Sequence, residues 1–236
     1  MIPWEEIDRA TVPGRKNELI LRRRGEEFSI RTGGTELMNS RMHWSEEALA
    51  NLAFEHMGQK TAGQGSGLRI LVGGLGMGYT LARTLALAPS DARILVAELI
   101  PEVIAWNRSV FGHLAGMPLN DPRVRVDASD VRAVIHRQTD AFNAILLDVD
   151  NGPAGLTQDA NNRLYAENGL KAAFRALTPG GVLGIWSAGD DPVFTRRLAN
   201  CRFKARAVPV SAVAPGRGGR HVVWIAVKPE AERWRK

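Results

Sequence analysis

The chain has 236 residues, of which 44% are hydrophobic and 24% are charged, and its formal net charge is +6. This length accommodates one sizeable α/β domain with an extension and is too short for two full domains. No apolar run approaches the ~20 residues of a membrane span, and the acidic, mixed N-terminal stretch resembles neither a signal nor a transit peptide. A single cysteine excludes an internal disulfide, so we expect a cytoplasmic protein.

The basic residues are partly clustered, as in Arg22-Arg23-Arg24 and Arg196-Arg197. Such clusters bind polyanions in other proteins, but here no nucleic-acid motif accompanies them and aromatic residues are not interleaved as stacking platforms. We therefore expect a solvated basic surface, with no specific nucleic-acid partner and no membrane partner. The net positive charge also argues against an acidic, concave binding site for a highly cationic substrate.

The first part of the chain predicts a small β extension followed by a helix. Residues 18–39 alternate in the manner of two or three short antiparallel strands with glycines at the turns. After a serine suited to an N-cap, apolar residues recur on one face of a helix over residues 46–57. The stretch 58–67 has the composition of a flexible linker, so we expect two units, 1–60 and 68–236.

After this linker, strands and helices alternate as an α/β topology requires. The predicted strands are 69–73, 93–98, 123–127, 143–148 and 182–187, with a closing hairpin of 203–210 and 221–227. Helices are predicted before Pro89, over 102–111, from about 130, over 165–177 and over 192–200. The pattern predicts a Rossmann-like α/β fold, in which a parallel sheet ends in a C-terminal antiparallel hairpin.

The most informative segment is residues 68–98. A short apolar strand ends in a glycine cluster, a helix follows, and a second strand ends on Glu98; the glycines are Gly73, Gly74, Gly76 and Gly78. Glycines let the backbone approach a ligand, and an acid at the end of the second strand accepts hydrogen bonds from both ribose hydroxyls.

The spacing of these glycines is G-x-G-x-G, whereas the dinucleotide fingerprint is G-x-G-x-x-G. S-adenosylmethionine carries no phosphate and needs only the close approach and the ribose acid. We therefore predict a nucleoside-type cofactor, with S-adenosylmethionine as the first candidate; the alternative is a structural glycine turn that binds nothing.

The chain resembles the spermidine synthase-like branch of class I S-adenosylmethionine-dependent transferases along nearly its full length. The similar segments are residues 49–52, the glycine motif 73–78, FNAILLD at 142–148 and Pro179-Gly180-Gly181, the last expected as a turn before strand five. The resemblance implies that Glu98 holds the ribose and that Asp127 and Ala128 contact adenine. It also implies that Asp148 lies beside the transferable group.

The chain departs from this family at several polar positions. Gly76 replaces the aspartate that holds the amino group of decarboxylated S-adenosylmethionine in the family. Arg41-Met42 occupy the positions of an acidic pair in the family, and Ser45-Glu46 occupy those of a tyrosine and a glutamine. Asn151 occupies the position of a second aspartate after strand four, and Trp186 that of a glutamine. Polyamines are multiply cationic and need carboxylate partners. The departures therefore weaken the case for a polyamine acceptor and leave the cofactor half of the site intact.

Asp148 is the first catalytic candidate, because it ends a buried strand where α/β sheets bind ligands. We expect it to orient an attacking amine or hydroxyl or to take its proton; the alternative is an aspartate that caps the following loop. Asp150 and Asn151 are further candidates, although Asp-Asn-Gly is also ordinary turn chemistry. Glu46 and Glu47 either stabilise the start of their helix or contact substrate.

Three functions remain open. The favoured one is an S-adenosylmethionine-dependent methyltransferase on a spermidine synthase-like scaffold, with an unknown small-molecule acceptor. The alternatives are a polyamine aminopropyltransferase that uses decarboxylated S-adenosylmethionine, and a non-catalytic nucleoside-binding or interaction protein, against which the glycine motif and Glu98 argue. No histidine or cysteine has metal-ligand spacing, so no metal is expected. A homodimer is compatible with all three functions.

Overall fold

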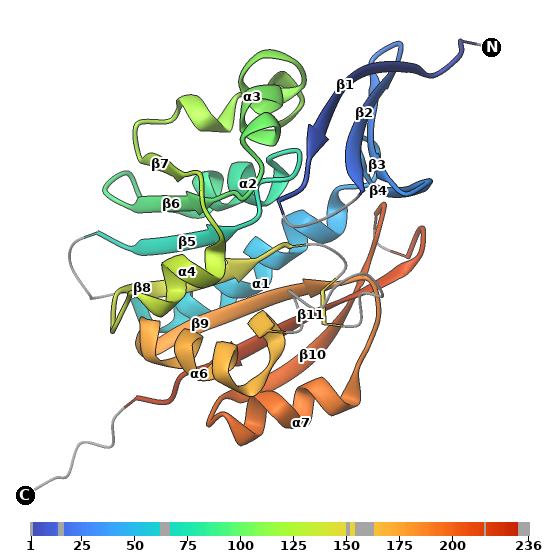
Figure 1. Cartoon of the computed structure of the whole chain (residues 1–236). Helices are drawn as coiled ribbons and strands as arrows, with labels where there is room; N and C mark the ends of the chain where they lie inside the picture. Colours follow the sequence, from blue (N-terminus) through green and yellow to red (C-terminus); the bar gives the residue numbers. More distant parts are fainter. Residues whose placement is uncertain are drawn as a thin grey trace, which may run out of the picture.

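The computed structural model describes residues 2–13, 17–61, 67–149, 152–153, 163–214 and 216–230. Within these residues the chain forms two sheets, a small antiparallel one near the N-terminus and a large, mostly parallel one (Figure 1). This arrangement confirms the predicted α/β fold with its N-terminal β extension. None of the helices in the described ranges is both long and apolar enough to cross a bilayer.

The small sheet has the order β1-β2-β3-β4, and its strands are β1 (Glu5–Thr11), β2 (Glu18–Arg24), β3 (Glu27–Thr32) and β4 (Thr35–Asn39). Three of them fall in the segment that was predicted to form strands. The fourth, β1, shows no hydrophobic alternation because Ala10 is its only buried residue. Ion pairs of Arg9 with Glu6 and Glu18 accompany its pairing with β2.

Helix α1 (Trp44–Thr61) follows the small sheet and is longer than predicted. It begins two residues before the predicted start and continues into the stretch expected to be a linker. Buried residues on one face, among them Leu49, Ala50 and Ala53, join the core that covers the large sheet. Packing of this apolar face stabilises the helix beyond what local composition indicates.

The large sheet is built as the alternating pattern predicts. Its strands are β5 (Arg69–Gly73), β6 (Arg93–Ala97), β7 (Val124–Asp127), β8 (Phe142–Leu147), β9 (Leu177–Ser187), β10 (Lys204–Ser211) and β11 (Arg220–Val227). Their order is β10-β11-β9-β8-β5-β6-β7, and β10 and β11 form the antiparallel closing hairpin.

Strand β9 differs from the prediction at its start. Pro179-Gly180-Gly181 was expected to be a turn before the strand, but β9 already begins at Leu177. The backbone of this segment pairs with the strand end after β11, because Gly180 N donates to Lys228 O and Lys228 N donates to Gly181 O. The register between β8 and β9 shifts at the same place, so the glycines bend a strand and do not end it.

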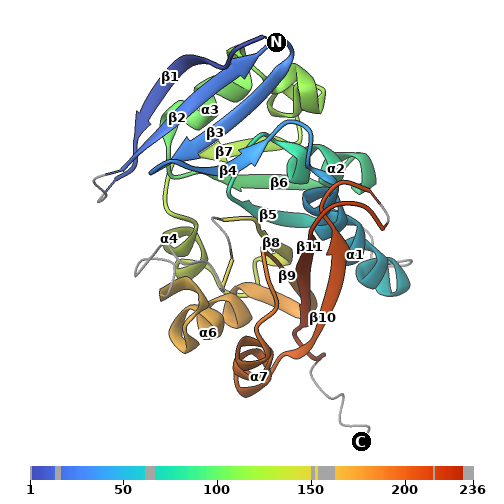
Figure 2. The ribbon, with the colours of Figure 1, turned by 90° about the vertical axis from the view of Figure 1, so that its right-hand side faces the viewer.

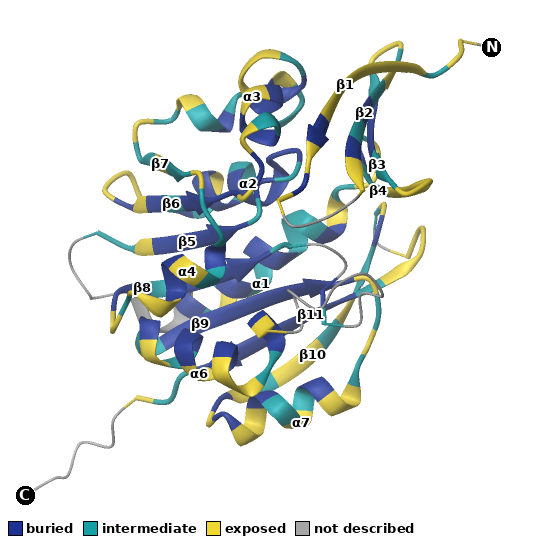
Figure 3. Cartoon of the chain, viewed as in Figure 1, coloured by how far each residue is buried: buried dark blue, intermediate teal, exposed yellow. Residues whose placement is uncertain are grey.

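Helices cover both faces of the large sheet because alternate strand residues point to opposite faces. Ile70 and Val72 face α1, α2 (Tyr79–Leu87) and α3 (Pro101–Ser109), whereas Leu71 faces α4 (Val131–His136), α6 (Glu167–Ala176) and α7 (Pro192–Asn200). Figure 2 shows the sheet between these two layers. The inner strands are buried almost throughout (Figure 3).

The small sheet packs at the carboxyl ends of the parallel strands (Figure 2). Trp106 Nε1 of α3 donates to Asp8 Oδ2 at 2.7 Å, and the rings of Phe28 and Phe111 lie 5.9 Å apart. Tyr79 OH, at the start of α2, donates to the carbonyl of Ser40 at 3.2 Å. These contacts place the small sheet above the glycine loop, where α/β sheets bind ligands.

Candidate active site

The glycine loop lies against the end of the neighbouring strand β8. Gly74 has φ +84°, and a Cβ added there would lie 2.2 Å from the carbonyl oxygen of Asp148. Gly74 N donates to Ala97 O at 2.9 Å, and Asp148 N donates to Gly73 O at 2.8 Å. Only glycine therefore fits at position 74, and the ends of three strands are joined around it.

Glu98 is held in place by the backbone around it. Its carboxylate accepts hydrogen bonds from Leu75 N at 2.8 Å and from Ile100 N at 2.9 Å, and its side chain is only 7% exposed. A carboxylate accepts up to about four hydrogen bonds, and these two bonds fix the orientation of the group. This geometry fits the predicted contact with ribose hydroxyls.

A cavity of about 180 Å³ lies between the glycine loop and the small sheet. Gly74, Gly76, Glu98 and Asp148 form its polar side, and Ile30, Leu37 and Met38 from the small sheet line it with apolar groups. An apolar pocket with a few converging polar groups is typical of small-molecule sites. The chemistry of these lining residues therefore suits a nucleoside.

Asn107 holds the glycine loop and was not predicted. Its Nδ2 donates to Gly76 O at 2.8 Å and to Val103 O at 2.9 Å, and its side chain is buried. A Cβ added to Gly78, which precedes α2 with φ +87°, would lie 2.9 Å from Asn107 Oδ1. In the sequence, Asn107 is marked only by its being an amide on the apolar face of α3.

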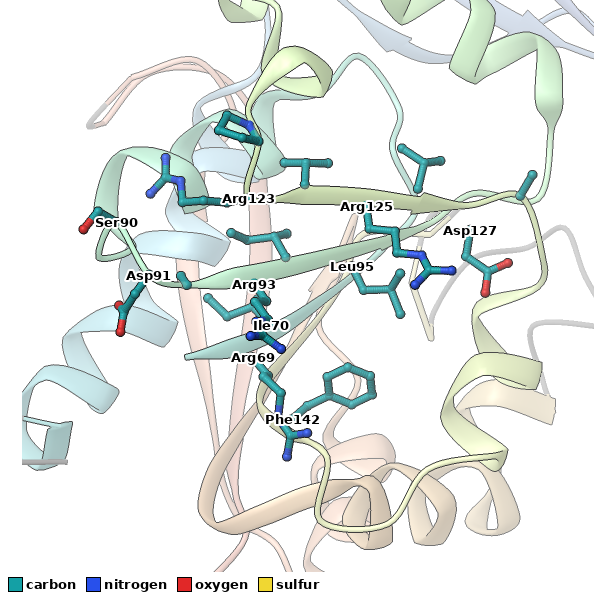
Figure 4. Close-up of a pocket in the computed structure, with 16 residues that line it drawn as sticks. Arg69, Ile70, Ser90, Asp91, Arg93, Leu95, Arg123, Arg125, Asp127 and Phe142 are labelled. Atoms are coloured by element: carbon teal, nitrogen blue, oxygen red, sulfur yellow. The ribbon is translucent and has the colours of Figure 1, made fainter. Parts of the chain in front are cut away.

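Asp127 and Ala128 do not line this cavity. They border a different hollow of about 890 Å³, where Arg69, Arg93 and Arg125 also lie (Figure 4). Asp127 pairs in register with Ala97, which packs on the α4 side, and its carboxylate lies 3.7 Å from Arg137. The contact with adenine therefore stays a prediction, and the structure gives Asp127 a different neighbour.

A second acid, Glu46, lies close enough to Asp148 for their charges to interact. Thr80 Oγ1 donates to Asp148 Oδ2 at 2.7 Å and lies 3.3 Å from the carbonyl oxygen of Glu46, in the first turn of α1. Burial raises the pKa of Asp148 to about 6, whereas burial and the charge of Asp148 raise the pKa of Glu46 to about 8. At neutral pH Asp148 is therefore mostly ionised and Glu46 mostly protonated.

A third carboxylate lies beside this pair. Glu47 Oε1 is 2.7 Å from His43 Nδ1, and the His43 ring stacks on Tyr79 at 4.1 Å. Burial, together with Glu46 and Glu47, raises the pKa of Tyr79 to about 12. Although the chain carries a net charge of +6, the fold thus gathers acidic groups here, and the expectation drawn from net charge does not hold at this site.

Two of the predicted catalytic residues, Asp150 and Asn151, lie outside the described residues. Within the described ranges, no group of three or more His, Cys, Asp or Glu side chains is arranged to hold a metal ion. The site that can be described therefore consists of the glycine loop, Glu98, Asp148 and the acids of α1.

A glycine loop at the carboxyl end of β5 and an acid after β6 are the features of a Rossmann-like protein, which binds ligands at this end of its sheet. The family described as "Spermine/spermidine synthase domain" matches residues 49–204, so the chain belongs to the spermine/spermidine synthase family.

Curated relatives agree with this assignment. A polyamine aminopropyltransferase from Nitrosomonas europaea is 32% identical over 132 residues, which cover 54% of this chain and 37% of that protein. Polyamine aminopropyltransferase 2 from Pseudomonas aeruginosa is 29% identical over 130 residues, which cover 52% of this chain and 35% of that protein. The match thus spans little more than a third of these relatives' length.

Solved structures show the same fold. A spermidine synthase in complex with the transition state analogue AdoDATO has a TM-score of 0.72 at 16% identity, covering 96% of this chain and 73% of its own. The spermidine synthase of Thermotoga maritima has a TM-score of 0.73 at 16% identity, and the match covers 98% of this chain and 75% of that chain.

These findings overturn the expectation of a methyltransferase, because the family and its curated relatives favour the aminopropyltransferase alternative. The error came from the acids lost at Gly76 and at Arg41-Met42. Their loss was taken to remove the partners of a cationic acceptor, whereas the fold brings Glu46 and Asp148 together at the same site.

Proposed function

We propose that this protein transfers an aminopropyl group from decarboxylated S-adenosylmethionine to an amine acceptor of the polyamine class. The observation that carries the proposal is the pair of Glu46 and Asp148 beside the glycine loop, where both carboxyl groups have raised pKa values. Membership of the spermine/spermidine synthase family supports the same reaction.

The reaction requires an acceptor amine that has lost one proton. The nitrogen lone pair forms a C–N bond to the aminopropyl carbon, and the C–S bond breaks with its electrons passing to sulfur. Polyamines are ammonium ions at neutral pH, so a base must remove a proton at the reacting nitrogen. Asp148, whose burial brings its pKa to about 6, lies nearer to neutrality than an ordinary aspartate and suits this role.

The acids of α1 would bind the charged parts of the acceptor. Without a bound cation Glu46 is protonated, because its burial and the charges of Asp148 and Glu47 oppose its ionisation. An ammonium group that enters between these carboxyls would take the place of that proton, since an opposite charge at close range favours the ionised form. Binding of a cation and ionisation of Glu46 are therefore coupled.

Gly74 and Glu98 would hold the nucleoside part of the donor, for which the close approach and the oriented carboxylate provide the fit. No acid is left in the glycine loop for the donor's ammonium, because Gly76 replaces the family's aspartate. We assign discrimination against intact S-adenosylmethionine to the charge of Asp148, which repels an additional carboxylate.

The test is the release of methylthioadenosine, measured by chromatography, from decarboxylated S-adenosylmethionine with putrescine, spermidine or other diamines. Intact S-adenosylmethionine serves as the control donor. Asp148→Asn should reduce kcat on the order of 10²–10⁴-fold, the usual range for a general base, whereas Glu55→Gln on the exposed part of α1 should change little. Binding of methylthioadenosine without turnover on any amine would reject the proposal and favour a non-catalytic nucleoside-binding protein.

A further inference from the structure

Two hydrogen bonds lead from Glu46 away from the substrate cavity. Ser45 Oγ lies 2.7 Å from Glu46 Oε2, and the same oxygen lies 2.9 Å from His221 Nδ1. Ser45 is fully buried, whereas His221 is half-buried. A hydroxyl accepts and donates at the same time, so Ser45 joins the carboxyl to the imidazole in one continuous chain.

His221 reaches Ser45 because of its place on β11. Val223 and Ile225 belong to the core on the α1 side of the sheet, and alternation puts His221 on that same face. The ring packs edge-on against Trp186 of β9, with centroids 4.8 Å apart and an interplanar angle of 73°. His221 stands near the start of β11, next to the exposed Arg220, where the hairpin opens to solvent.

We infer that Ser45 and His221 form a proton relay between the Glu46–Asp148 pair and solvent, with the relay's catalytic role resting on the function proposed above. The proton lost by the acceptor nitrogen passes to the carboxyl pair. Glu46 then donates its proton to Ser45 Oγ, and Ser45 donates its own to His221 Nδ1. The imidazolium releases its Nε2 proton to water. One proton leaves the site, and no oxidant or further reactant is needed.

The surroundings of the relay set the resting protonation state of each of its members. Burial lowers the pKa of His221, so the ring is neutral near pH 7 and its Nδ1 can accept a proton. The other ionisable groups about Glu46 are Asp148 after β8 and Glu47 on α1, both of which oppose its ionisation. Among the described residues, Tyr79 at the start of α2 and His43 before α1 lie beside the same acids, and Tyr79 stays protonated because its pKa is raised to about 12.

The relay predicts which tautomer the neutral His221 ring adopts. While Glu46 is protonated, it donates a hydrogen bond to Ser45, and Ser45 donates one to His221 Nδ1. In this state Nδ1 is unprotonated and Nε2 carries the proton. Once Glu46 ionises, it accepts from Ser45, whose oxygen then accepts from His221, so the proton moves to Nδ1. The neutral ring should therefore exchange tautomers as the pH rises through the pKa of Glu46, about 8. A purely structural hydrogen bond predicts no such exchange.

The test is ¹⁵N nuclear magnetic resonance of the His221 ring in the intact protein from pH 6 to pH 10, without substrate. The expected result is a change from the Nε2–H to the Nδ1–H tautomer in the wild type. The change should be absent in Ser45→Ala, which interrupts the chain, and in Glu46→Gln, which cannot ionise. A tautomer that stays constant in the wild type, or that changes equally in Ser45→Ala, overturns the relay.

Kinetics then connect the relay to turnover. His221→Gln should lower kcat about tenfold or more with little change in KM, and the loss should be greatest where Glu46 is protonated. His136→Gln, on the exposed side of α4, is the matched control. A tautomer change without methylthioadenosine release would reject the proposed function and leave the relay intact, whereas turnover without the tautomer change would reject the relay alone.

Discussion

Replacing Glu46 by glutamine should stabilise the protein, and by an amount that grows with pH. Glu46 is an acid whose burial and proximity to Asp148 raise its pKa from 4.5 to about 8. As pH rises above 4.5, the unfolded chain loses this proton while the folded chain keeps it. Stability therefore falls with rising pH until the folded group also ionises near pH 8, and it is constant above that pH.

The magnitude follows from the pKa displacement. At about 1.36 kcal/mol for each pKa unit, a change from 4.5 to about 8 corresponds to an upper bound of roughly 5 kcal/mol. The side chain is partly exposed and shares its proton balance with Asp148, which reduces the expected effect to about 2–4 kcal/mol. Glutamine has the same shape, and its amide group still forms a hydrogen bond with Ser45 Oγ, as donor or as acceptor.

The assay is urea unfolding of the wild type and of Glu46→Gln at pH 4.5, 6.5 and 8.5. The two proteins should differ by less than about 0.5 kcal/mol at pH 4.5, and the variant should be more stable by about 2–4 kcal/mol at pH 8.5. Glu55→Gln removes the same charge from the exposed side of the same helix and should show no pH-dependent gain. A stability difference that is the same at all three pH values would refute the reasoning, because it would mean that Glu46 is not perturbed.

Three further substitutions test the cofactor half of the site. Glu98→Gln should weaken methylthioadenosine binding about tenfold or more in calorimetry, since charged hydrogen bonds contribute about 1.5–3 kcal/mol each; unchanged affinity would remove Glu98 from the site. Glutamine is preferable to alanine here, because alanine would also leave Leu75 N and Ile100 N without their acceptor. Gly74→Ala should cost more stability than Gly34→Ala in urea, because both have φ +84° but only Gly74 lacks room for a Cβ; equal losses would mean that the close approach to Asp148 is not needed. Gly76→Asp should shift preference toward decarboxylated S-adenosylmethionine over the intact form by about 1–3 kcal/mol, and a shift toward the intact form would contradict the assigned geometry.

The succession of strands and helices along the chain was predictable because each element carries its own local pattern. Apolar runs between glycine or proline punctuation gave the positions of β5, β6 and β8 to within a residue. The glycine spacing and the acid after β6 indicated a nucleoside pocket for the same reason, since both lie within one strand-turn-helix-strand unit. Strand β1 was missed because an edge strand with one buried residue has no such pattern.

The sequence by itself thus determined the α/β fold, the glycine loop and Glu98, all of which depend on residues that are close together along the chain. Only the tertiary structure decided which distant side chains share the site. Asp148 meets Glu46 through Thr80, and His221 reaches Ser45 across 176 positions of the chain. The hydrophobic period and the spacing of residues along the sequence specify the face of an element on which a residue lies. The order of strands in the sheet and the packing of helices specify which residues lie opposite it. The acids that favour a cationic acceptor were for this reason visible only after the chain had folded.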